Sequence, residues 1–279
     1  MLTVDPKEIP VPKLHHYLLG AIGPRPIAFA STVDKNGNRN LSPFSFFNVF
    51  SANPPILVFS PARSGRTGET KNTFDNVKET KEVVINVVNY DIVQQMSLSS
   101  SPYAKDVDEF VKSGLTPIAS ETIKPFRVKE SPVQFECKVN EIVELGQNGG
   151  AGNLVICEVL KIHINEDVLD DSGMIDQHKI DLVSRMGGNW YCRANDESMF
   201  EIQKPITTIG IGVDTIPTEI KNSTILTGND LGLLGSVEAL PTEAEISAYS
   251  TFTGEKHKEA KKLIANGKIE NAWKVLLSK

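Results

Sequence analysis

Residues 133–164 read VQFECKVNEIVELGQNGGAGNLVICEVLKIHI and carry the clearest folding pattern of the chain. From 133 to 145 apolar and polar residues alternate, and a period of two predicts a half-buried antiparallel strand. A glycine-rich loop follows at 146–152, and the apolar segment 153–164 is long enough to pair back along the whole preceding strand. Two long paired strands of this kind predict the wall of a β-barrel.

The rest of the first 130 residues adds more strand signals. An apolar run at 27–33 ends in an Asn-Gly turn, which supplies the positive φ angles of a tight hairpin, and a return strand is expected next. The apolar segments 56–59 and 83–88 predict two buried strands, and short helices are predicted at 90–98 and 104–112. Because strands and helices do not alternate as βαβ units, this order favours an antiparallel barrel with helical insertions.

The sequence changes character after residue 193, and Lys204-Pro205 is the expected domain junction. The chain has 279 residues and 30.6 kDa, which fits one large domain or two small ones at roughly 100 to 200 residues per domain. We therefore expect a first domain at 1–204 and a mixed, partly helical C-terminal extension at 205–279. Two helical pieces separated by Asn266-Gly267 are expected near its end, and its apolar content predicts that it packs on the barrel.

Composition and missing motifs exclude several classes of function. Apolar residues at 40% and charged residues at 23% are globular values, and a net charge of −6 without a basic block argues against a nucleic-acid partner. The three cysteines are far apart and odd in number, so neither a disulfide framework nor a zinc site is predicted. No secretory leader and no stretch of the ~18 apolar residues that span a bilayer is recognised, so a cytoplasmic location without membrane contact is expected. P-loop and Rossmann glycine motifs are missing, and no metal site is expected.

A polar cluster at 60–73, SPARSGRTGETKNT, follows one of the apolar strands and leads into a possible helix at 74–78. It combines cationic and hydroxyl side chains with two glycines and a helix N-terminus, which are the components of a phosphate site. An ordinary surface loop with a threonine cap explains the same residues equally well.

An aromatic cluster lies at 40–51, NLSPFSFFNVFS, where four of the twelve phenylalanines fall within seven residues. Small hydroxyls and an amide interleave with these rings, so the segment can offer flat apolar surface together with backbone N–H groups. A planar heterocycle needs that combination. An aromatic barrel core is the alternative, and the spacing alone favours the core somewhat.

Three segments, in this order, resemble the flavin reductase-like, FMN-binding split-barrel family: RPIAFAST at 25–32, NLSPFSFFN at 40–48 and KNT at 71–73. Supporting segments are Pro54-Pro55, 108–110, 113–115, 152–164, 184–188 and Tyr191. The resemblance spans about residues 10–200 and covers nothing after Pro205. It implies a mainly β fold, a split β-barrel of antiparallel, Greek-key type with short helical insertions, and FMN held non-covalently at the interface of a homodimer.

The resemblance also implies which residues hold FMN. Ser31 and Thr32 are expected near the flavin or its ribityl chain. The isoalloxazine edge is expected along Ser45, Phe46 and Phe47. The residues expected at the phosphate are Ser60, Arg63, Lys71 and Thr73. The family's usual Lys-Asp-Thr motif reads Lys-Asn-Thr here, so Asn72 cannot take any charge role of the usual aspartate.

The implied activity is that of an FMN-dependent NAD(P)H:flavin oxidoreductase, which takes hydride from NADH or NADPH onto flavin N5. The cofactor carries this chemistry, so no side chain is assigned as an acid or base. His163 lies on a barrel strand, either as a satisfied histidine or as a flavin contact near the dimer interface. Two alternatives stay open: a flavodoxin-like carrier that exchanges electrons with a protein partner, and a non-enzymatic flavin-binding module whose residues 205–279 form the partner surface.

Overall fold

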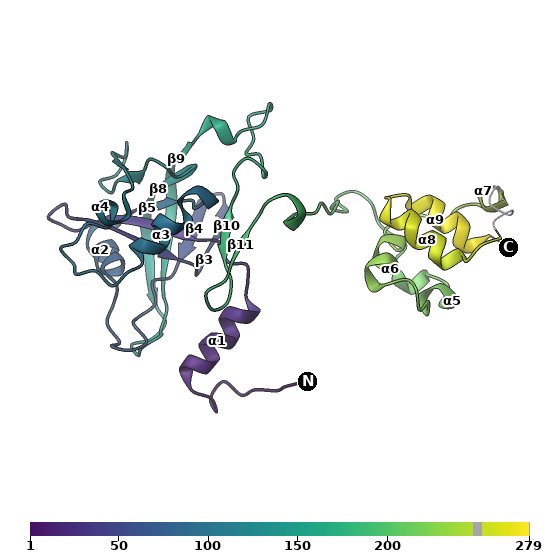
Figure 1. Cartoon of the computed structure of the whole chain (residues 1–279), viewed down its shortest axis with the longest axis horizontal. Helices are drawn as coiled ribbons and strands as arrows, with labels where there is room; N and C mark the ends of the chain where they lie inside the picture. The colour runs from purple at the N-terminus through teal and green to yellow at the C-terminus, as the bar shows by residue number, and fades with distance from the viewer. Residues whose placement is uncertain (248–252, 279) are drawn as a thin grey trace. The chain divides into compact units, whose positions relative to one another are not determined.

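The computed structural model describes residues 1–247 and 253–278, and the chain divides into two compact units, 1–200 and 201–279 (Figure 1). Every strand found in the described residues belongs to the first unit, whereas the described part of the second unit contains helices and turns. The expected packing of residues 205–279 on the barrel stays a prediction.

A seven-stranded sheet forms the main body of the first unit, and all its neighbouring strands are antiparallel. In the order β2-β1-β5-β8-β9-β4-β3 the strands are Arg39–Phe44, Ala28–Val33, Glu82–Asn86, Val133–Glu144, Asn153–Ile164, Pro55–Phe59 and Phe47–Ala52. β8 and β9 pair along their whole length, from Val133 opposite Ile164 to Glu144 opposite Asn153. The long hairpin predicted from the alternating residues is thereby confirmed.

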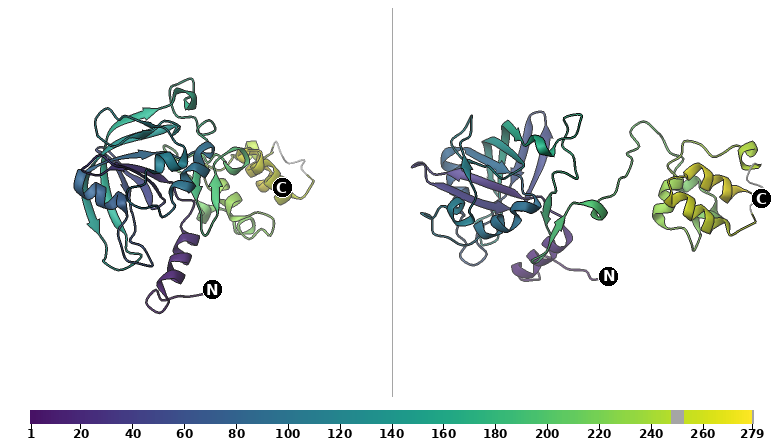
Figure 2. Two further views of the ribbon diagram at one scale, coloured as in Figure 1. Left: turned by 60° about the vertical axis from the view of Figure 1, so that its left-hand side comes forward. Right: turned by 45° about the horizontal axis from the view of Figure 1, so that its top comes forward.

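This sheet must curl, because its two edge strands follow one another in the chain. β2 ends at Phe44 and β3 begins at Phe47, so one short corner joins opposite edges of the sheet. At this corner the Phe46 carbonyl accepts a hydrogen bond from the Ser60 amide (2.8 Å), and the Phe44 and Phe59 rings lie 5.7 Å apart. No hydrogen-bonded ladder joins β2 to β3 in the described residues, which leaves an open seam. The predicted antiparallel barrel is confirmed (Figure 2).

Apolar side chains from alternate strand positions fill the interior of the barrel. β1 contributes the small residues Ala28 and Ala30, and helix α2 (Asn72–Thr80) contributes Phe74 and Val77 to the same buried cluster. Alternate residues of a strand point to one face, so two alanines on β1 leave room for the larger side chains of α2. The helix predicted at 74–78 is confirmed, with two extra residues at each end.

Two short helices pack in a second core cluster on the opposite face of β1. α3 (Val93–Ser99) buries Met96, and α4 (Glu109–Ser113) buries Phe110, both in the cluster that contains Phe29 of β1. These helices and the barrel interior cover both faces of β1, so all six of its residues are buried, including Ser31 and Thr32.

The helix predicted at 104–112 is wrong at its start. The Asp108 carboxylate accepts a hydrogen bond from the Phe110 amide (3.0 Å) and caps the helix there, so residues before Asp108 lie outside it. Gly114, with a φ of 69°, ends the helix as expected for a residue in the left-handed region.

The first unit has further elements outside the seven-stranded sheet. They are α1 (Val11–Ala21), the 3₁₀ turns η1 (Tyr90–Ile92), η2 (Glu166–Val168) and η3 (Asp196–Ser198), the paired strands β6 (Pro117–Ile118) and β7 (Arg127–Val128), and the hairpin of β10 (Val183–Arg185) and β11 (Tyr191–Arg193). α1 has no buried residue, and its contacts with the rest of the unit include His15 with Phe46 and the Leu19 carbonyl with Arg25.

The second unit has a hydrophobic core of its own. Its elements are η4 (Val213–Thr215), α5 (Thr218–Lys221), α6 (Gly228–Leu234), α7 (Glu243–Ser247), α8 (Lys256–Ala265) and α9 (Ile269–Leu277). Trp273 is fully buried in this core and its indole N–H donates to the Leu234 carbonyl (2.9 Å). The two C-terminal helices separated by Asn266-Gly267 are confirmed. Across the described parts of both units, every helix is too short or too polar to pass through a bilayer.

Candidate functional site

A hollow of about 310 Å³ opens in the first unit where the β2–β3 corner meets α1 and the β10–β11 hairpin. Its volume lies at the lower end of the roughly 300–1,000 Å³ typical of small-molecule sites. The residues that line it are His15, Leu19, Arg25, Ser42, Pro43, Phe44, Ser45, Phe46, Ser60, Ala62, Lys71, Ser100, Arg185 and Met186. We call it the cationic hollow.

The charge of this lining is one-sided. Arg25, Lys71 and Arg185 contribute three cations and His15 a fourth basic group, while no aspartate or glutamate lines the hollow. In the described residues none of the three cations forms an ion pair with a carboxylate elsewhere. Like charges brought together without a counter-charge favour an anionic ligand.

Arg25 holds the frame of the hollow. Its side chain donates to the Leu19 carbonyl (2.8 Å), the Met186 carbonyl (2.8 Å) and the Ile22 carbonyl, and its Nε lies 3.5 Å from the Ser45 hydroxyl. The carbonyls of α1 would otherwise lack partners at the helix C-terminus, where a cation is also favourable. Arg25 is only 5% exposed, and this burial, with the nearby charge of Arg185, lowers the pKa of its guanidinium below the ordinary value. Arg25 therefore fixes α1 and the β10–β11 hairpin around the hollow.

The loop after β4 forms the opposite side of the hollow. The Ser60 hydroxyl accepts a hydrogen bond from the Asn153 amide (3.0 Å), and the Arg63 amide donates to the Ala151 carbonyl (2.8 Å). A Cβ on Gly152 would come within 2.9 Å of the Ser60 hydroxyl, so this position of the glycine-rich loop requires the small residue. The glycine-rich loop 146–152 thus positions the polar loop of 60–73.

Lys71 stands at the point where this polar loop becomes helix α2. It is the residue before the first helical turn, and it lines the hollow. The N-terminal end of a helix carries a partial positive charge and unpaired amides, which adds to the charge of the lysine. The phosphate-type site expected from the 60–73 cluster therefore has its lysine and its helix end in one place.

Four of the nine expected FMN ligands meet in the cationic hollow, namely Ser45, Phe46, Ser60 and Lys71. Phe46 is 39% exposed there and its ring lies edge-on to His15, with 6.4 Å between ring centres. The aromatic cluster is therefore divided: Phe46 faces the hollow, whereas Phe47 packs against the barrel core.

The other expected ligands lie outside the lining. Thr32 and Thr73 are buried and joined by Asn40, whose amide nitrogen donates to Thr32 Oγ1 (3.1 Å) and Thr73 Oγ1 (2.8 Å). Arg63 donates to the Glu144 carboxylate (3.2 Å) and the Gln147 side chain (2.9 Å). The Arg63 guanidinium, which the family resemblance assigns to the phosphate, is therefore bound to the Glu144 carboxylate of β8 in this structure.

Ser31 is the last of the nine. It is fully buried in β1, and its hydroxyl has no hydrogen-bond partner in the described residues. Sequence reasoning did not select Arg25, Arg185 or His15, although it used the segments around the two arginines. The available signal was that each arginine lies inside its segment, Arg25 as the first residue of 25–32 and Arg185 as the second residue of 184–188.

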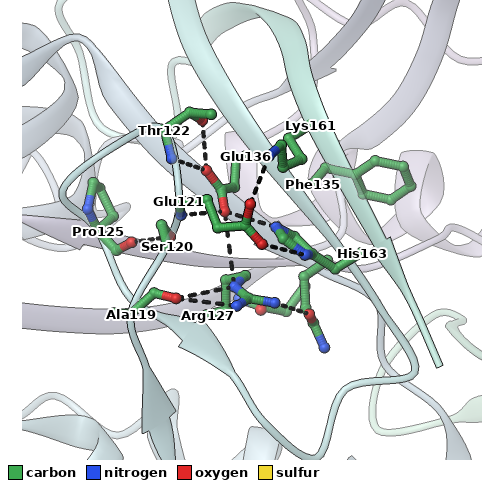
Figure 3. A network of polar contacts seen from close by, with 12 residues as sticks. Ala119, Ser120, Glu121, Thr122, Pro125, Arg127, Phe135, Glu136, Lys161 and His163 are labelled. Carbon is green, nitrogen blue, oxygen red and sulfur yellow. Dashed lines mark hydrogen bonds and ion pairs between the residues drawn. The ribbon is translucent and has the colours of Figure 1, made fainter.

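His163 belongs to a separate polar network on the barrel wall (Figure 3). Its Nε2 lies 2.7 Å from Glu136 Oε1, and the buried Glu136 carboxylate also accepts hydrogen bonds from the Thr122 hydroxyl (2.5 Å) and the Glu121 amide (2.8 Å). Burial opposes ionisation of Glu136, but the hydrogen bonds from Thr122, Glu121 and His163 outweigh it and lower the pKa of Glu136 to about 2. The Nε2 atom of His163 thus has its hydrogen-bond partner in Glu136 of the neighbouring strand β8, and His163 does not line the cationic hollow.

Comparison with known proteins adds the following. A family model described as a flavin reductase like domain matches residues 21–181, all within the first unit. An uncharacterized protein of Aquifex aeolicus is 36% identical over 197 residues, which cover 70% of this chain and 97% of that protein. The crystal structure of nitrilotriacetate monooxygenase component B from Bacillus cereus is similar at 31% identity and a TM-score of 0.67, covering 72% of this chain and 98% of that one.

A structure described as a flavin reductase with a split barrel domain, from Shewanella frigidimarina, is 28% identical with a TM-score of 0.59 and covers 71% of this chain and 96% of that one. The open-seamed antiparallel barrel therefore has the split-barrel fold expected from the sequence.

Proposed function

The chain belongs to the flavin reductase-like family, and from this premise we propose that it is an FMN-binding oxidoreductase that passes hydride from NADH or NADPH to flavin N5. The observation that carries the proposal is the cationic hollow, whose lining combines three cations and no carboxylate with two phenylalanines and four serines. A mononucleotide with an anionic phosphate and a planar ring needs these groups together.

The chemistry of the lining fits FMN. Lys71, the N-terminal end of α2 and the Ser60 hydroxyl would hold the phosphate, because they combine positive charge with hydrogen-bond donors. Phe46 and Ser45 would line the ring. Thr32 and Thr73 would act from behind the lining, through the shared Asn40, rather than by direct contact.

When bound, FMN would supply the ring that accepts hydride, so the protein needs no acid or base of its own. The residues of the chain bind and orient. Arg25 and Arg185 place fixed positive charge beside the ring site, and such charge stabilises negative charge that develops on reduction. Arg25 is held by three carbonyls and does not have to rearrange during the reaction.

We also propose a homodimer in which the second copy covers the hollow. β3 is an edge strand whose Val49 and Phe50 are 62% and 68% exposed, and the partly exposed Phe46 directly precedes it. Exposed apolar residues grouped on an edge strand favour burial against another protein surface. The Bacillus cereus neighbour is by its name one component of a monooxygenase, which supports an electron-accepting protein as the partner of this chain. A cytoplasmic location is also part of the proposal.

Anaerobic mixing of the FMN-loaded protein with NADH and with NADPH tests the proposal. We expect the purified protein to be yellow and the visible absorbance of the flavin to bleach rapidly, roughly within the turnover times of ordinary enzymes. Slow bleaching would instead support a flavin electron carrier or a binding module. A colourless protein that takes up no added FMN would contradict flavin binding altogether.

A further inference from the structure

A second hollow, of about 190 Å³, lies in the first unit and plays no part in the proposed function. Its walls come from η1, α3 and the β10–β11 hairpin, and the residues that line it include Tyr90, Ser97, Tyr191 and Arg193. We call it the tyrosine hollow. It is smaller than the roughly 300–1,000 Å³ of pockets that enclose a whole small molecule. A space of this size suits one end of a ligand whose other end lies elsewhere.

The tyrosine hollow and the cationic hollow share a wall. Arg185 lines the cationic hollow, Tyr191 lines the tyrosine hollow, and the two residues face each other across the β10–β11 ladder. The guanidinium carbon of Arg185 lies 4.6 Å from the centre of the Tyr191 ring. On the α3 side, Ser97 lines one hollow and Ser100 the other, less than one helical turn apart. A ligand that occupied both hollows would pass over the Arg185–Tyr191 stack.

Two tyrosine rings offer stacking surface in the tyrosine hollow. Tyr90 is 49% exposed and Tyr191 is 38% exposed. Arg193 supports Tyr90 with its guanidinium carbon 3.8 Å from the ring centre, and Asp181 fixes that guanidinium through two contacts of 2.7 Å. Rings that are held in place before a ligand arrives lose little freedom on binding, and they favour a planar heterocycle such as adenine.

Arg185 provides positive charge between the two hollows. In the described residues it forms no ion pair, and its side chain donates to the Trp190 carbonyl (3.2 Å). A guanidinium has five donors in a fork that matches phosphate oxygens, so most of this capacity is left for a ligand. A diphosphate group that crosses the shared wall would find its counter-charge at this position.

We propose that the tyrosine hollow binds the adenosine end of a dinucleotide whose other end enters the cationic hollow, with the diphosphate at Arg185. This rests on the proposed function, because the cationic hollow must accept the reacting end. The adenosine diphosphate group is common to NADH, NADPH and FAD, so the same chemistry can come from the reductant or from a flavin dinucleotide.

Calorimetric titration of the full chain with ADP-ribose tests the adenosine site, since this probe has the adenosine and the diphosphate without nicotinamide or flavin. We expect ADP-ribose to bind, and Tyr90→Ala to weaken the binding by roughly five- to a hundredfold, the effect of losing one stacked base. Tyr90→Phe keeps the ring and should restore the binding. The matched control is Tyr103→Ala, because Tyr103 also lies near a cation, Lys112 at 5.9 Å, but does not line the hollow. Absence of ADP-ribose binding, or equal binding by the unmodified chain and Tyr90→Ala, would overturn the proposal.

Two comparisons identify the source of the adenosine diphosphate group. If the source is the reductant, KM is lower for NADH than for reduced nicotinamide mononucleotide, and Tyr90→Ala removes most of that difference. If it is a flavin dinucleotide, FAD binds more tightly than FMN, and Tyr90→Ala removes that difference instead. FMN titration and bleaching by reduced nicotinamide mononucleotide need no adenosine, so their failure contradicts the proposed function. Their success without any effect of Tyr90→Ala contradicts only the adenosine site.

Discussion

Arg25 and Arg185 are joined by a pair of backbone hydrogen bonds, with the Arg25 amide donating to the Arg185 carbonyl (2.9 Å) and the Arg185 amide donating to the Arg25 carbonyl (2.8 Å). Both side chains then line the same hollow, although their charges repel each other; burial and, after it, this repulsion lower the pKa of Arg25. The two backbone hydrogen bonds hold the two arginines next to each other in the folded protein. An anion in the hollow would relieve the repulsion, and for this reason the pair is central to the predictions below.

Lys71→Ala should weaken FMN binding by about 1.5 to 3 kcal/mol, the range for losing a hydrogen bond to a charged group. The barrel should stay folded, because Lys71 lies at the rim of the hollow and outside the core. Calorimetric titration with FMN measures the effect, and Lys138→Ala on the exposed side of β8 is the control. Equal FMN affinity in Lys71→Ala and the unmodified chain would refute the phosphate assignment.

Arg25→Lys should reduce the free energy of unfolding of the first unit by about 1.5 to 3 kcal/mol and also weaken FMN binding. A lysine keeps the charge but cannot reach the Leu19, Ile22 and Met186 carbonyls from one planar group. Urea denaturation followed by circular dichroism gives the stability. Arg66→Lys serves as control, since Arg66 is exposed in the neighbouring loop. An unchanged denaturation midpoint would mean that α1 and the hairpin are held by other contacts.

Glu136 should make stability depend on acid pH. Its pKa is about 2 in the folded protein, below the 4.5 of an unperturbed glutamate, so its contribution is fully present above about pH 4.5 and is lost as the pH falls towards 2. Glu136→Gln should therefore be less stable than the unmodified chain at pH 7, by at most about 3 kcal/mol, and this difference should shrink by pH 3. Urea denaturation at both pH values measures it, with the exposed Glu141→Gln as control. A difference that stays constant with pH would refute the role of ionised Glu136.

Trp273→Ala should destabilise the second unit by about 3 to 5 kcal/mol, because it removes the largest buried side chain of that core and its hydrogen bond to Leu234. FMN affinity should not change, since every residue of the cationic hollow lies in the first unit.

Truncation after Lys204 should likewise keep the flavin site, with lower stability or aggregation if residues 205–279 pack on the barrel. Loss of FMN affinity in either variant would mean that the second unit completes the site.

Phe50→Glu should shift the protein from dimer to monomer and release flavin on dilution. Phe50 is exposed on the edge strand β3, where a charge would have to be buried in the proposed interface. Light scattering and flavin fluorescence across a dilution series follow both events. Val111→Glu, at a similarly exposed apolar position (72%) on α4 outside β3 and the hollow, controls for added charge. A monomer that remains saturated with FMN in the unmodified chain would rule out the shared site.

Much of the fold could be predicted because its signals are local. The alternation at 133–145 depends only on neighbouring residues, and it correctly predicted the longest strand pair. The Asn-Gly turn and the glycine at the end of α4 also act through the conformation of one or two residues. The start of α4 was mispredicted, since a single capping carboxylate at Asp108 set it rather than a periodic pattern.

The site depended on partners that lie far apart in the sequence. The family resemblance predicted Lys71 and Ser60 as phosphate ligands, and this stays a prediction. The sequence could not show that Arg63 donates to Glu144 of β8 or that Glu136 is the partner of His163. Nor could it show that Arg25 meets Arg185. Which of several equivalent cations or hydroxyls is free for a ligand is decided by competition among side chains brought together by strand register. Local composition supplied the candidates for this site, and the tertiary structure selected among them because register and side-chain pairing exist only once the chain has folded.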